Sequence, residues 1–177
     1  MFRVVRILYA QLVGTFRAKI NPTQEVRLKM RVWPGEVDLT RVNQAMYLFY
    51  CELGRWDIIQ RSGMKPFIAQ HKCIPVVASQ MIRITRSLKR LQTFELRSHF
   101  SYWDEKWFYI DHSIVSEGKL IAVAQVRGLF KGKGKNFSTY EILKSMGLDP
   151  TSPPAPQRIL SWIEAENLLV VEKKSKL

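Results

Sequence analysis

Residues 43–61 carry a helical pattern that is apolar around much of its circumference, and few folds can bury such a helix. The apolar residues that recur at this spacing are Ala45, Leu48, Phe49, Leu53, Trp56 and Ile59. Asn43 and Thr40 are the candidate caps of its start, and Ser62-Gly63 is a typical stop. Gly54 in the interior costs about 1 kcal/mol relative to alanine, so we expect close packing against a neighbour there. The pattern therefore predicts a central helix.

Alternating patterns on both sides of this helix predict strands. Residues 25–33 place Val26, Leu28, Met30 and Val32 on one face and basic residues on the other. Further strands are expected at residues 74–84, 94–102, 107–115 and 120–130, and the last two are joined by a turn at Ser116 to Lys119. In residues 74–84, the pattern predicts that one face carries Ile74, Val76, Ala78, Ile82 and Ile84. One strand, a buried helix and about four antiparallel strands make an α+β order.

The two ends of the chain differ from this central domain, which we expect to span residues 24–150. Residues 1–20 predict an amphipathic N-terminal segment, in which Phe2, Val5, Leu8, Leu12 and Phe16 fall at helical spacing. This segment is a candidate for an interfacial membrane anchor, or for a helix packed on the domain or its dimer partner. Residues 151–177 predict a Pro-rich linker, a short helix from Gln157 to Leu168 and a disordered basic tail. A basic loop at 131–135 and a short helix at 138–146 precede them.

A formal net charge of +13 predicts a polyanionic partner, which is nucleic acid, an anionic membrane or a phosphate-rich molecule such as coenzyme A. Stacking rings in the run 102–109 are interrupted by Asp104 and Glu105, so packing explains them better than nucleic-acid binding. Cys51 and Cys73 form neither a disulfide framework nor a zinc motif, which favours reduced thiols in a cytoplasmic protein. The histidines lack metal-ligand spacing, so we expect no metal and interpret as strand residues His71, His99 and His112.

The segment Trp33 to Leu48 resembles the D-x-D-x-x-G-H-x-N-N-x-x-Y-L signature of the 4-hydroxybenzoyl-CoA and acyl-CoA thioesterase families. The likeness continues in order through residues 52–57, 61–63, 83–89, 103–109 and 126–130. The chain is also similar to thioesterase-like proteins that begin with a basic, apolar segment. The resemblance implies the hot-dog fold, in which an antiparallel sheet wraps around a long central helix. It further implies a homodimer, or a tetramer made of two dimers, with the active site at the subunit interface.

The resemblance also implies roles for individual residues. Asp38 matches the second acid of the signature, which implies a catalytic carboxylate that acts as nucleophile or as base toward water. The backbone N–H of Gln44 matches the position that polarises the thioester oxygen. Asn43 and Tyr47 match the first Asn and the Tyr, which implies a catalytic and a substrate-binding position. Asp38 as a turn residue and Asn43 as a helix cap are the structural alternatives. Glu52 on the helix is a second candidate carboxylate.

The sequence departs from the signature in four positions and in length. Glu36 stands at the first acid, Thr40-Arg41 replaces Gly-His, Gln44 replaces the second Asn, and one residue is missing before Asn43. These departures leave open a second function, a non-catalytic acyl-CoA-binding or lipid-binding protein that docks on a membrane through its N-terminal segment. A nucleic-acid binder would rest on charge alone, and we expect none.

The leading hypothesis is hydrolysis of a hydrophobic acyl-CoA or aryl-CoA, with no cofactor other than the CoA of the substrate. Two basic clusters are candidates for binding its phosphates. One comprises Arg127, Lys131, Lys133 and Lys135, and the other comprises Arg83, Arg86, Lys89 and Arg90. Each is equally compatible with a solvated basic surface.

Overall fold

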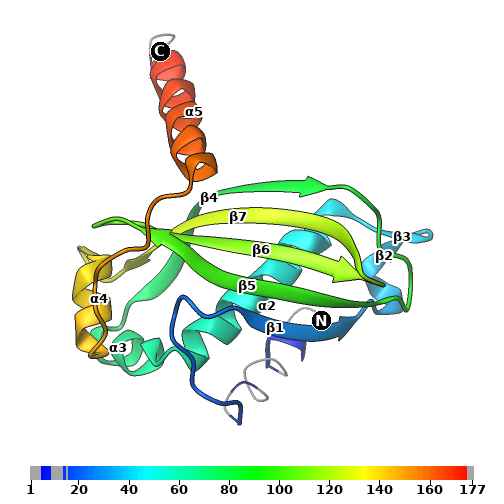
Figure 1. Cartoon of the computed structure of the whole chain (residues 1–177), viewed down its shortest axis with the longest axis horizontal. Coiled ribbons are helices and arrows are strands. Elements are labelled where there is room, and N and C mark those ends of the chain that lie inside the picture. Colours follow the sequence, from blue (N-terminus) through cyan, green and yellow to red (C-terminus); the bar gives the residue numbers. More distant parts are fainter. Residues whose placement is uncertain (1–4, 9–13, 15, 175–177) are drawn as a thin grey trace.

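The computed structural model describes residues 5–8, 14 and 16–174, and these form one sheet curled around one long helix (Figure 1). The sheet has the strand order β1-β5-β6-β7-β4, and each neighbouring pair is antiparallel. Its strands are β1 (Val26–Arg31), β5 (Thr93–Trp103), β6 (Phe108–Ser116), β7 (Lys119–Lys131) and β4 (Ile74–Ile84). The predicted tight turn between β6 and β7 is confirmed, because Glu117 and Gly118 both have the positive φ that such a hairpin requires.

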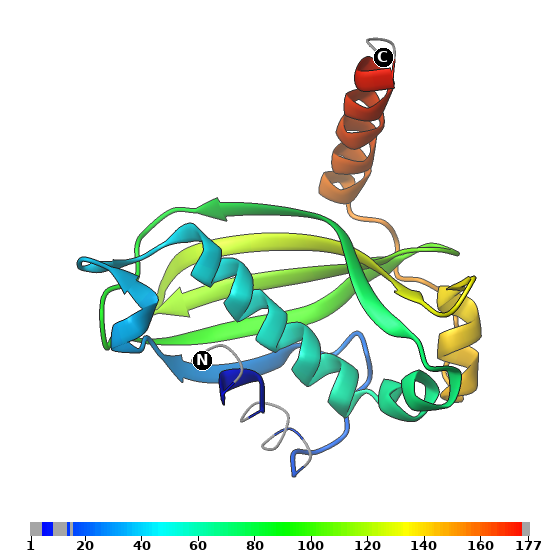
Figure 2. The same cartoon turned by 180° about the vertical axis from the view of Figure 1, so that it is seen from behind.

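Helix α2 (Gln44–Arg61) lies in the curl of the sheet, so the predicted hot-dog fold is confirmed (Figure 2). Its first half packs with Leu96 and Ile114 of the sheet, and its second half packs with Phe100 and Phe108. The expected close approach at Gly54 is present. A Cβ there would collide with Ser98 Oγ of β5 and would lie 3.0 Å from Leu96 Cδ2. The helix is therefore pressed against the sheet at this point.

Short elements close the two ends of the curl. At the end of α2, α3 (Met64–His71) and α4 (Thr139–Ser145) add Phe67 and Ile142 to the buried cluster, and β8 (Asn136–Phe137) pairs with β7. At the start of α2, the 3₁₀ turn η1 (Pro34–Glu36) leads into a small hairpin of β2 (Val37–Asp38) and β3 (Arg41–Val42).

Helix α5 (Gln157–Lys174) lies on the outer face of the sheet, opposite α2. It starts over the sheet and rises past the β4 edge (Figures 1 and 2). The sequence predicted a short helix followed by a disordered tail from Lys173, which is wrong because α5 has 18 residues and ends at Lys174. No Gly or Pro follows Pro156, so nothing in the local sequence stops the helix earlier.

Two other predictions are wrong. His71 lies in α3 rather than in a strand, because the helix after Gly63 lacks a long apolar repeat and was not recognised. In β4, a register shift between Val77 and Ser79 reverses the alternation of side chains. Ile74 and Val76 therefore do not share the face of Ile82 and Ile84. The predicted faces of β1 are confirmed.

The described residues of the N-terminal segment do not pack on the central domain through the apolar side that the sequence predicted. Residues 5–8 are helical, and there Arg6 is buried and Ile7 packs against the core. Val5, Leu8 and Phe16, which belong to the predicted apolar stripe, are exposed. Phe2 and Leu12 of that stripe lie outside the described residues. The domain boundaries at 20, 24, 150 and 151 stay a prediction.

Candidate active site

Asp38 lies in the β2–β3 hairpin, directly opposite Arg41. The chain turns between them at Leu39, which has a φ of 59° and a fully solvent-exposed side chain. The side chain of Asp38 is also exposed, and within the described residues it makes no hydrogen bond or ion pair. Asp38 is therefore neither a helix cap nor a buried structural acid. Its carboxylate is free to meet a ligand.

The helix that follows this hairpin presents an accessible N-terminus. Asn43 is its N-cap, and its Oδ1 accepts a hydrogen bond of 3.1 Å from Met46 N. The cap predicted at Asn43 is thus confirmed. Gln44 and Ala45 at the first two helical positions are exposed. Because a helix leaves the N–H groups of its first turn without intrahelical partners, these amides and the helix dipole favour negative charge beside the hairpin.

Tyr47 supports the hairpin through a hydrogen bond to Leu88. Its buried hydroxyl accepts a 2.8 Å hydrogen bond from Leu88 N, and burial raises the pKa of this phenol. Leu88 O in turn accepts a 3.0 Å hydrogen bond from Val42 N, and Arg41 bridges to Lys89. The hairpin is therefore tied to residues 86–92, which follow β4.

Glu36, which matches the first acid of the signature, is buried in an ion pair that sequence reasoning did not detect. Its carboxylate lies 3.0 Å from the guanidinium of Arg6 and accepts hydrogen bonds from Tyr50 Oη at 2.9 Å and Trp33 N at 2.8 Å. The guanidinium of Arg6 also stacks over the Trp33 ring at 4.7 Å. Glu36 therefore connects the N-terminal segment to α2, and its carboxylate is occupied by protein groups.

A basic groove of about 620 Å³ lies between residues 86–92 and the β6–β7 turn. Its cationic residues are Arg41, Arg86, Lys89, Arg90 and Lys119, and Glu117 is its acidic residue. Three of them belong to the second predicted basic cluster. Arg41 and Lys119 were not predicted, because neither lies near that cluster in the sequence. Arg41, the cross-strand partner of Asp38, connects this groove to the hairpin, whereas Asp38 itself does not line it.

A second cavity, of about 110 Å³, lies between the second half of α2 and the sheet. Most of its lining is apolar and includes Trp56, Ile59, Phe100, Ile110, Val126 and Phe130. Glu52 and Arg55 of α2 also line it. Burial lowers the pKa of Arg55, and its Nη1 has no hydrogen-bond partner among the described residues. The cavity reaches β4 at Pro75, Val76 and Val77, so it lies at the open edge of the sheet.

The structure does not bring the first predicted basic cluster to Asp38. Arg127 lies on the outer face of the sheet, where it forms a 2.7 Å ion pair with Glu166 of α5 and stacks over Trp107. Lys131 ends β7 opposite Ile74, and Lys133 follows in the loop before β8. Lys135 contacts Glu141 at 3.4 Å. Within one chain, these residues lie toward the other end of β4 from the hairpin.

His112 is a buried histidine that faces α2 from β6. Its Nδ1 lies 2.7 Å from Ser98 Oγ, and its Nε2 has no partner among the described residues. Burial, followed by the nearby charge of Arg55, holds the pKa of His112 well below its ordinary value. The imidazole is therefore neutral at physiological pH and belongs to the packing of α2 on the sheet.

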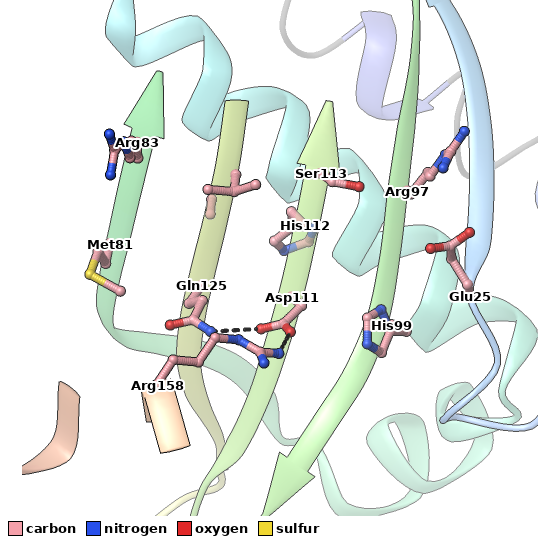
Figure 3. A pocket seen from close by; sticks show the side chains of 12 residues that line it. Glu25, Met81, Arg83, Arg97, His99, Asp111, His112, Ser113, Gln125 and Arg158 are labelled. Carbon is pink, nitrogen blue, oxygen red and sulfur yellow. Dashed lines mark hydrogen bonds and ion pairs between the residues drawn. The ribbon is translucent and has the colours of Figure 1, made fainter. Parts of the chain in front are cut away.

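The outer face of the sheet carries a separate groove of about 500 Å³ (Figure 3). Arg158 of α5 pairs with Asp111 in its floor, and Gln125 donates a 3.1 Å hydrogen bond to the same carboxylate. Met81 of β4 and Val123 of β7 form its apolar side next to the sheet edge. This groove is on the opposite side of the sheet from α2, Asp38 and the cavity.

Across the part of the chain that the structure describes, no helix is long and apolar enough to cross a membrane. The same residues contain no group of three or more His, Cys, Asp or Glu that could hold a metal ion. Cys51 and Cys73 are both free and buried, as the sequence predicted.

Known proteins resemble this chain in sequence and in fold. Residues 32–163 match the model of the thioesterase-like superfamily. Protein THEM6 of Xenopus laevis is 30% identical over 158 residues, a match that covers 84% of this chain and 74% of that protein. The structure of YbaW, a probable thioesterase from Escherichia coli, has a TM-score of 0.62 at 21% identity and covers 68% of this chain and 94% of its own. A DHNA-CoA thioesterase from Staphylococcus aureus has a TM-score of 0.62 at 12% identity, covering 86% of this chain and 95% of its own. At these identities, the two structures show the shared fold alone.

Proposed function

We infer, because this chain belongs to the thioesterase-like superfamily, that it hydrolyses a thioester between coenzyme A and a hydrophobic acyl or aryl group. The observation that carries this inference is the position of Asp38. Asp38 is exposed and unpaired among the described residues, it lies in the hairpin that leads into the open first turn of α2, and its cross-strand neighbour Arg41 lines the basic groove. In the proposal, these three parts supply the nucleophile or base, the oxyanion site and the phosphate-binding surface of thioester hydrolysis.

In the proposed reaction, water is added across the C–S bond of the thioester. Asp38 either takes a proton from the attacking water or attacks the carbonyl carbon itself, and the acyl–Asp38 anhydride is then hydrolysed. The carbonyl oxygen gains negative charge in both routes, and the N–H of Gln44 stabilises it with the helix dipole. Coenzyme A leaves as the thiolate and is protonated by solvent. Asn43 and Tyr47 hold the helix start and the hairpin in place.

The acyl group is proposed to bind across a homodimer that pairs two β4 strands. β4 has 11 residues and is the edge strand of the sheet, so its outer backbone groups are open to pairing. The first residues of β4 line the apolar cavity. The end of β4 leads to Leu88, whose N–H donates the hydrogen bond to Tyr47 beneath the hairpin. Antiparallel pairing about a two-fold axis would therefore place the hairpin of one subunit beside the cavity of the other. The same pairing would bring Lys131 and Lys133 toward the partner's hairpin.

The phosphates of coenzyme A are proposed to bind in the basic groove, with Arg86, Lys89 and Lys119 as ligands. Arginine and lysine side chains bind phosphate oxygens through charge-assisted hydrogen bonds. Arg127 is excluded from this role in the proposal, because its guanidinium already pairs with Glu166. Tetramers formed from two such dimers remain compatible with this arrangement.

Asp38→Asn tests the proposal, because it keeps the size of the side chain and removes its charge. With a panel of short, medium and long acyl-CoAs and aryl-CoAs, we expect kcat to fall at least 100-fold, in line with the contribution of a general base. Asp149→Asn is the matched control, since Asp149 is an exposed turn residue near α4. Normal turnover by Asp38→Asn would refute the mechanism. An absence of turnover by the wild type on any thioester would refute the enzymatic function.

The second candidate function is acyl-CoA or lipid binding without hydrolysis. It is favoured by one observation, which is that Arg41 stands opposite Asp38, where the family signature has a His. A guanidinium at that place would hold the carboxylate in an ion pair when a ligand excludes water. Saturable binding of a non-hydrolysable acyl-CoA analogue, together with stable acyl-CoA in the presence of the protein, would support this function over catalysis.

A peripheral contact with a membrane is proposed for the N-terminal segment. Val5, Leu8 and Phe16 are large apolar side chains on its exposed side, which is the arrangement of an interfacial segment. Replacing all three with Ser should abolish co-sedimentation with anionic vesicles and leave thioesterase activity on soluble acyl-CoA unchanged. Undiminished co-sedimentation of this variant would refute the contact.

A further inference from the structure

Helix α5 is fixed to the outer face of the sheet along one of its sides. Ile159 and Trp162 are buried against Tyr109 of β6. One turn later, Glu166 pairs with Arg127 of β7, and Ser79 of β4 donates a hydrogen bond to it. These α5 residues are spaced by three and four, so they lie on the same side of the helix. That side follows the sheet from β6 to its last strand, β4.

The same side of α5 continues beyond the sheet. Leu169 follows Trp162 by seven residues, or about two helical turns, and 58% of its surface is exposed. Both views show the C-terminal part of α5 beyond the β4 edge of the sheet (Figures 1 and 2). Leu169 is therefore a largely exposed apolar residue on the same side of α5 as Trp162 and Glu166.

The surface next to the β4 edge is also incomplete in a single chain. Met81 of β4 and Val123 of β7 are 44% and 37% exposed and both line the outer groove, where Arg83 is the cross-strand neighbour of Val123. Figure 3 shows Met81 and Arg83 along the same strand, β4. These residues lie on the face of the sheet that α5 occupies. Among the described residues of one chain, Leu169 of α5 thus has no sheet surface to pack on. Met81 and Val123 on the outer face of the sheet are likewise not covered by another segment.

We propose that α5 is an exchanged arm, which crosses the dimer axis and packs Leu169 on the outer face of the partner subunit at Met81 and Val123. This inference rests on the pairing of β4 strands in the proposed function. In such a dimer, the sheet continues from β4 of one subunit into β4 and then β7 of the other. Its outer faces lie on the same side, so the arm meets a continuous surface after it leaves its own chain.

The length of α5 fits this role. Leu169 lies three residues after Glu166, about 4.5 Å along the helix, and the last helical residue, Lys174, lies eight residues after Glu166, about 12 Å along the helix. Neighbouring strands lie about 4.8 Å apart, so Leu169 reaches the partner's β4 and the end of the helix reaches over its β7. Because a two-fold interface is isologous, each subunit gives one arm and receives one. The two arms cover the junction of the β4 strands and one side of each outer groove.

Leu169→Glu tests the arm, with Leu160→Glu as the matched control. Leu160 is an exposed leucine of the same helix, and it lies on the opposite side from Trp162 at 100° per residue. In sedimentation equilibrium, we expect Leu169→Glu to raise the dimer dissociation constant at least tenfold and Leu160→Glu to change it less than twofold. Neither side chain is buried, so near-UV circular dichroism should match the wild type for both variants.

Cross-linking gives a second, geometric measurement. Two differently tagged chains are co-expressed, one with Leu169→Cys and the other with Met81→Cys, and treated with a short bismaleimide. The native thiols are buried, and burial raises the pKa of Cys51 to about 12, so they remain unreactive. We expect a covalent heterodimer carrying both tags, and none when Leu160→Cys replaces Leu169→Cys.

The outcomes separate this inference from the one on which it rests. A wild-type protein that stays monomeric at tens of micromolar would overturn both the β4 pairing and the arm. A dimer that Leu169→Glu leaves unchanged, with no cross-link to Met81→Cys, would overturn the arm alone. Loss of vesicle binding by Leu169→Glu without a change in dimerisation would overturn it as well, and would assign this side of α5 to a lipid surface.

Discussion

At the scale of single residues, the buried pair of Glu36 and Arg6 makes a testable contribution to stability. Glu36→Gln leaves a side chain of the same size but removes the charge that compensates the buried guanidinium. Because an uncompensated buried charge costs 3–5 kcal/mol, we expect a loss of about this size in the free energy of unfolding, measured by urea denaturation. The control is Glu25→Gln at an exposed pair with Arg27, where the expected loss is below about 1 kcal/mol. Equal losses would contradict the structural role of Glu36.

The buried His112 predicts a dependence of stability on pH. Its folded-state pKa lies well below the ordinary value of 6.5. As the pH falls below 6.5, the unfolded chain binds a proton at this imidazole and the folded chain does not, so folding loses stability by up to about 1.4 kcal/mol per pH unit. The loss continues until the pH reaches the folded-state pKa, and above 6.5 the contribution is complete.

His112→Gln removes this titration and retains a group that can bond to Ser98. Urea denaturation at intervals between pH 7.5 and 5 should therefore show a flatter profile for His112→Gln than for the wild type. A slope that survives His112→Gln would assign the acid sensitivity to other groups.

The residue-level predictions succeeded where the signal is local. Asn43 was one of two candidate caps, and its capping hydrogen bond is confirmed, because capping depends on residues within one turn. The catalytic role of Asp38 stays a prediction. The role of Glu36 was missed, because its partner Arg6 lies 30 residues earlier and no spacing rule connects them. Tyr47 matches the signature, but only the fold could show that its hydroxyl bonds to Leu88.

At the scale of elements, the contact between α2 and β5 depends on the absence of a side chain at Gly54. Gly54→Ala raises helix propensity by about 1 kcal/mol, but the new methyl would collide with Ser98 Oγ. Since overpacking a core costs typically 1–3 kcal/mol, we expect a net loss in the free energy of unfolding. A double-mutant cycle with Ser98→Ala checks the cause, because removing Oγ should recover part of the loss. Full additivity would contradict a direct clash.

The central elements were predictable because their periodicity is long and regular. The helix at 44–61 and the strands after it each repeat the same apolar spacing several times, and the observed bounds of α2 differ from the prediction by one residue. The missed elements are short or interrupted. α3 has eight residues, β8 has two, and the bulge in β4 reverses an alternation that looked continuous in the sequence. Periodicity is a weak signal in an element that spans only one or two repeats.

At the scale of the whole molecule, one chain separates the parts that thioester hydrolysis needs. Asp38 and the basic groove lie at the start of α2, and the apolar cavity lies along its second half, where residues from Glu52 to Ile59 line it. At 1.5 Å per residue, these residues are about 12 to 22 Å from Gln44 along the helix, so a thioester carbon beside Asp38 lies outside the cavity of the same chain. The sequence could not show this separation, because it depends on where the two ends of α2 meet the sheet. The proposed antiparallel pairing of two β4 strands would remove this distance.

Subunit complementation tests the shared site. One variant is Asp38→Asn, and the other is Val126→Phe, which fills the cavity from its β7 wall. Each homodimer should be inactive toward the best acyl-CoA. In a co-expressed heterodimer isolated with two tags, shared sites would place both substitutions in one of the two active sites and leave the other active site without a substitution. We therefore expect about half of the wild-type kcat per dimer. Sites contained within single chains would each carry one defect, and the tagged heterodimer would then stay inactive. Thermal denaturation of the Val126→Phe homodimer serves as the control that its loss of activity comes from a filled cavity in a folded protein.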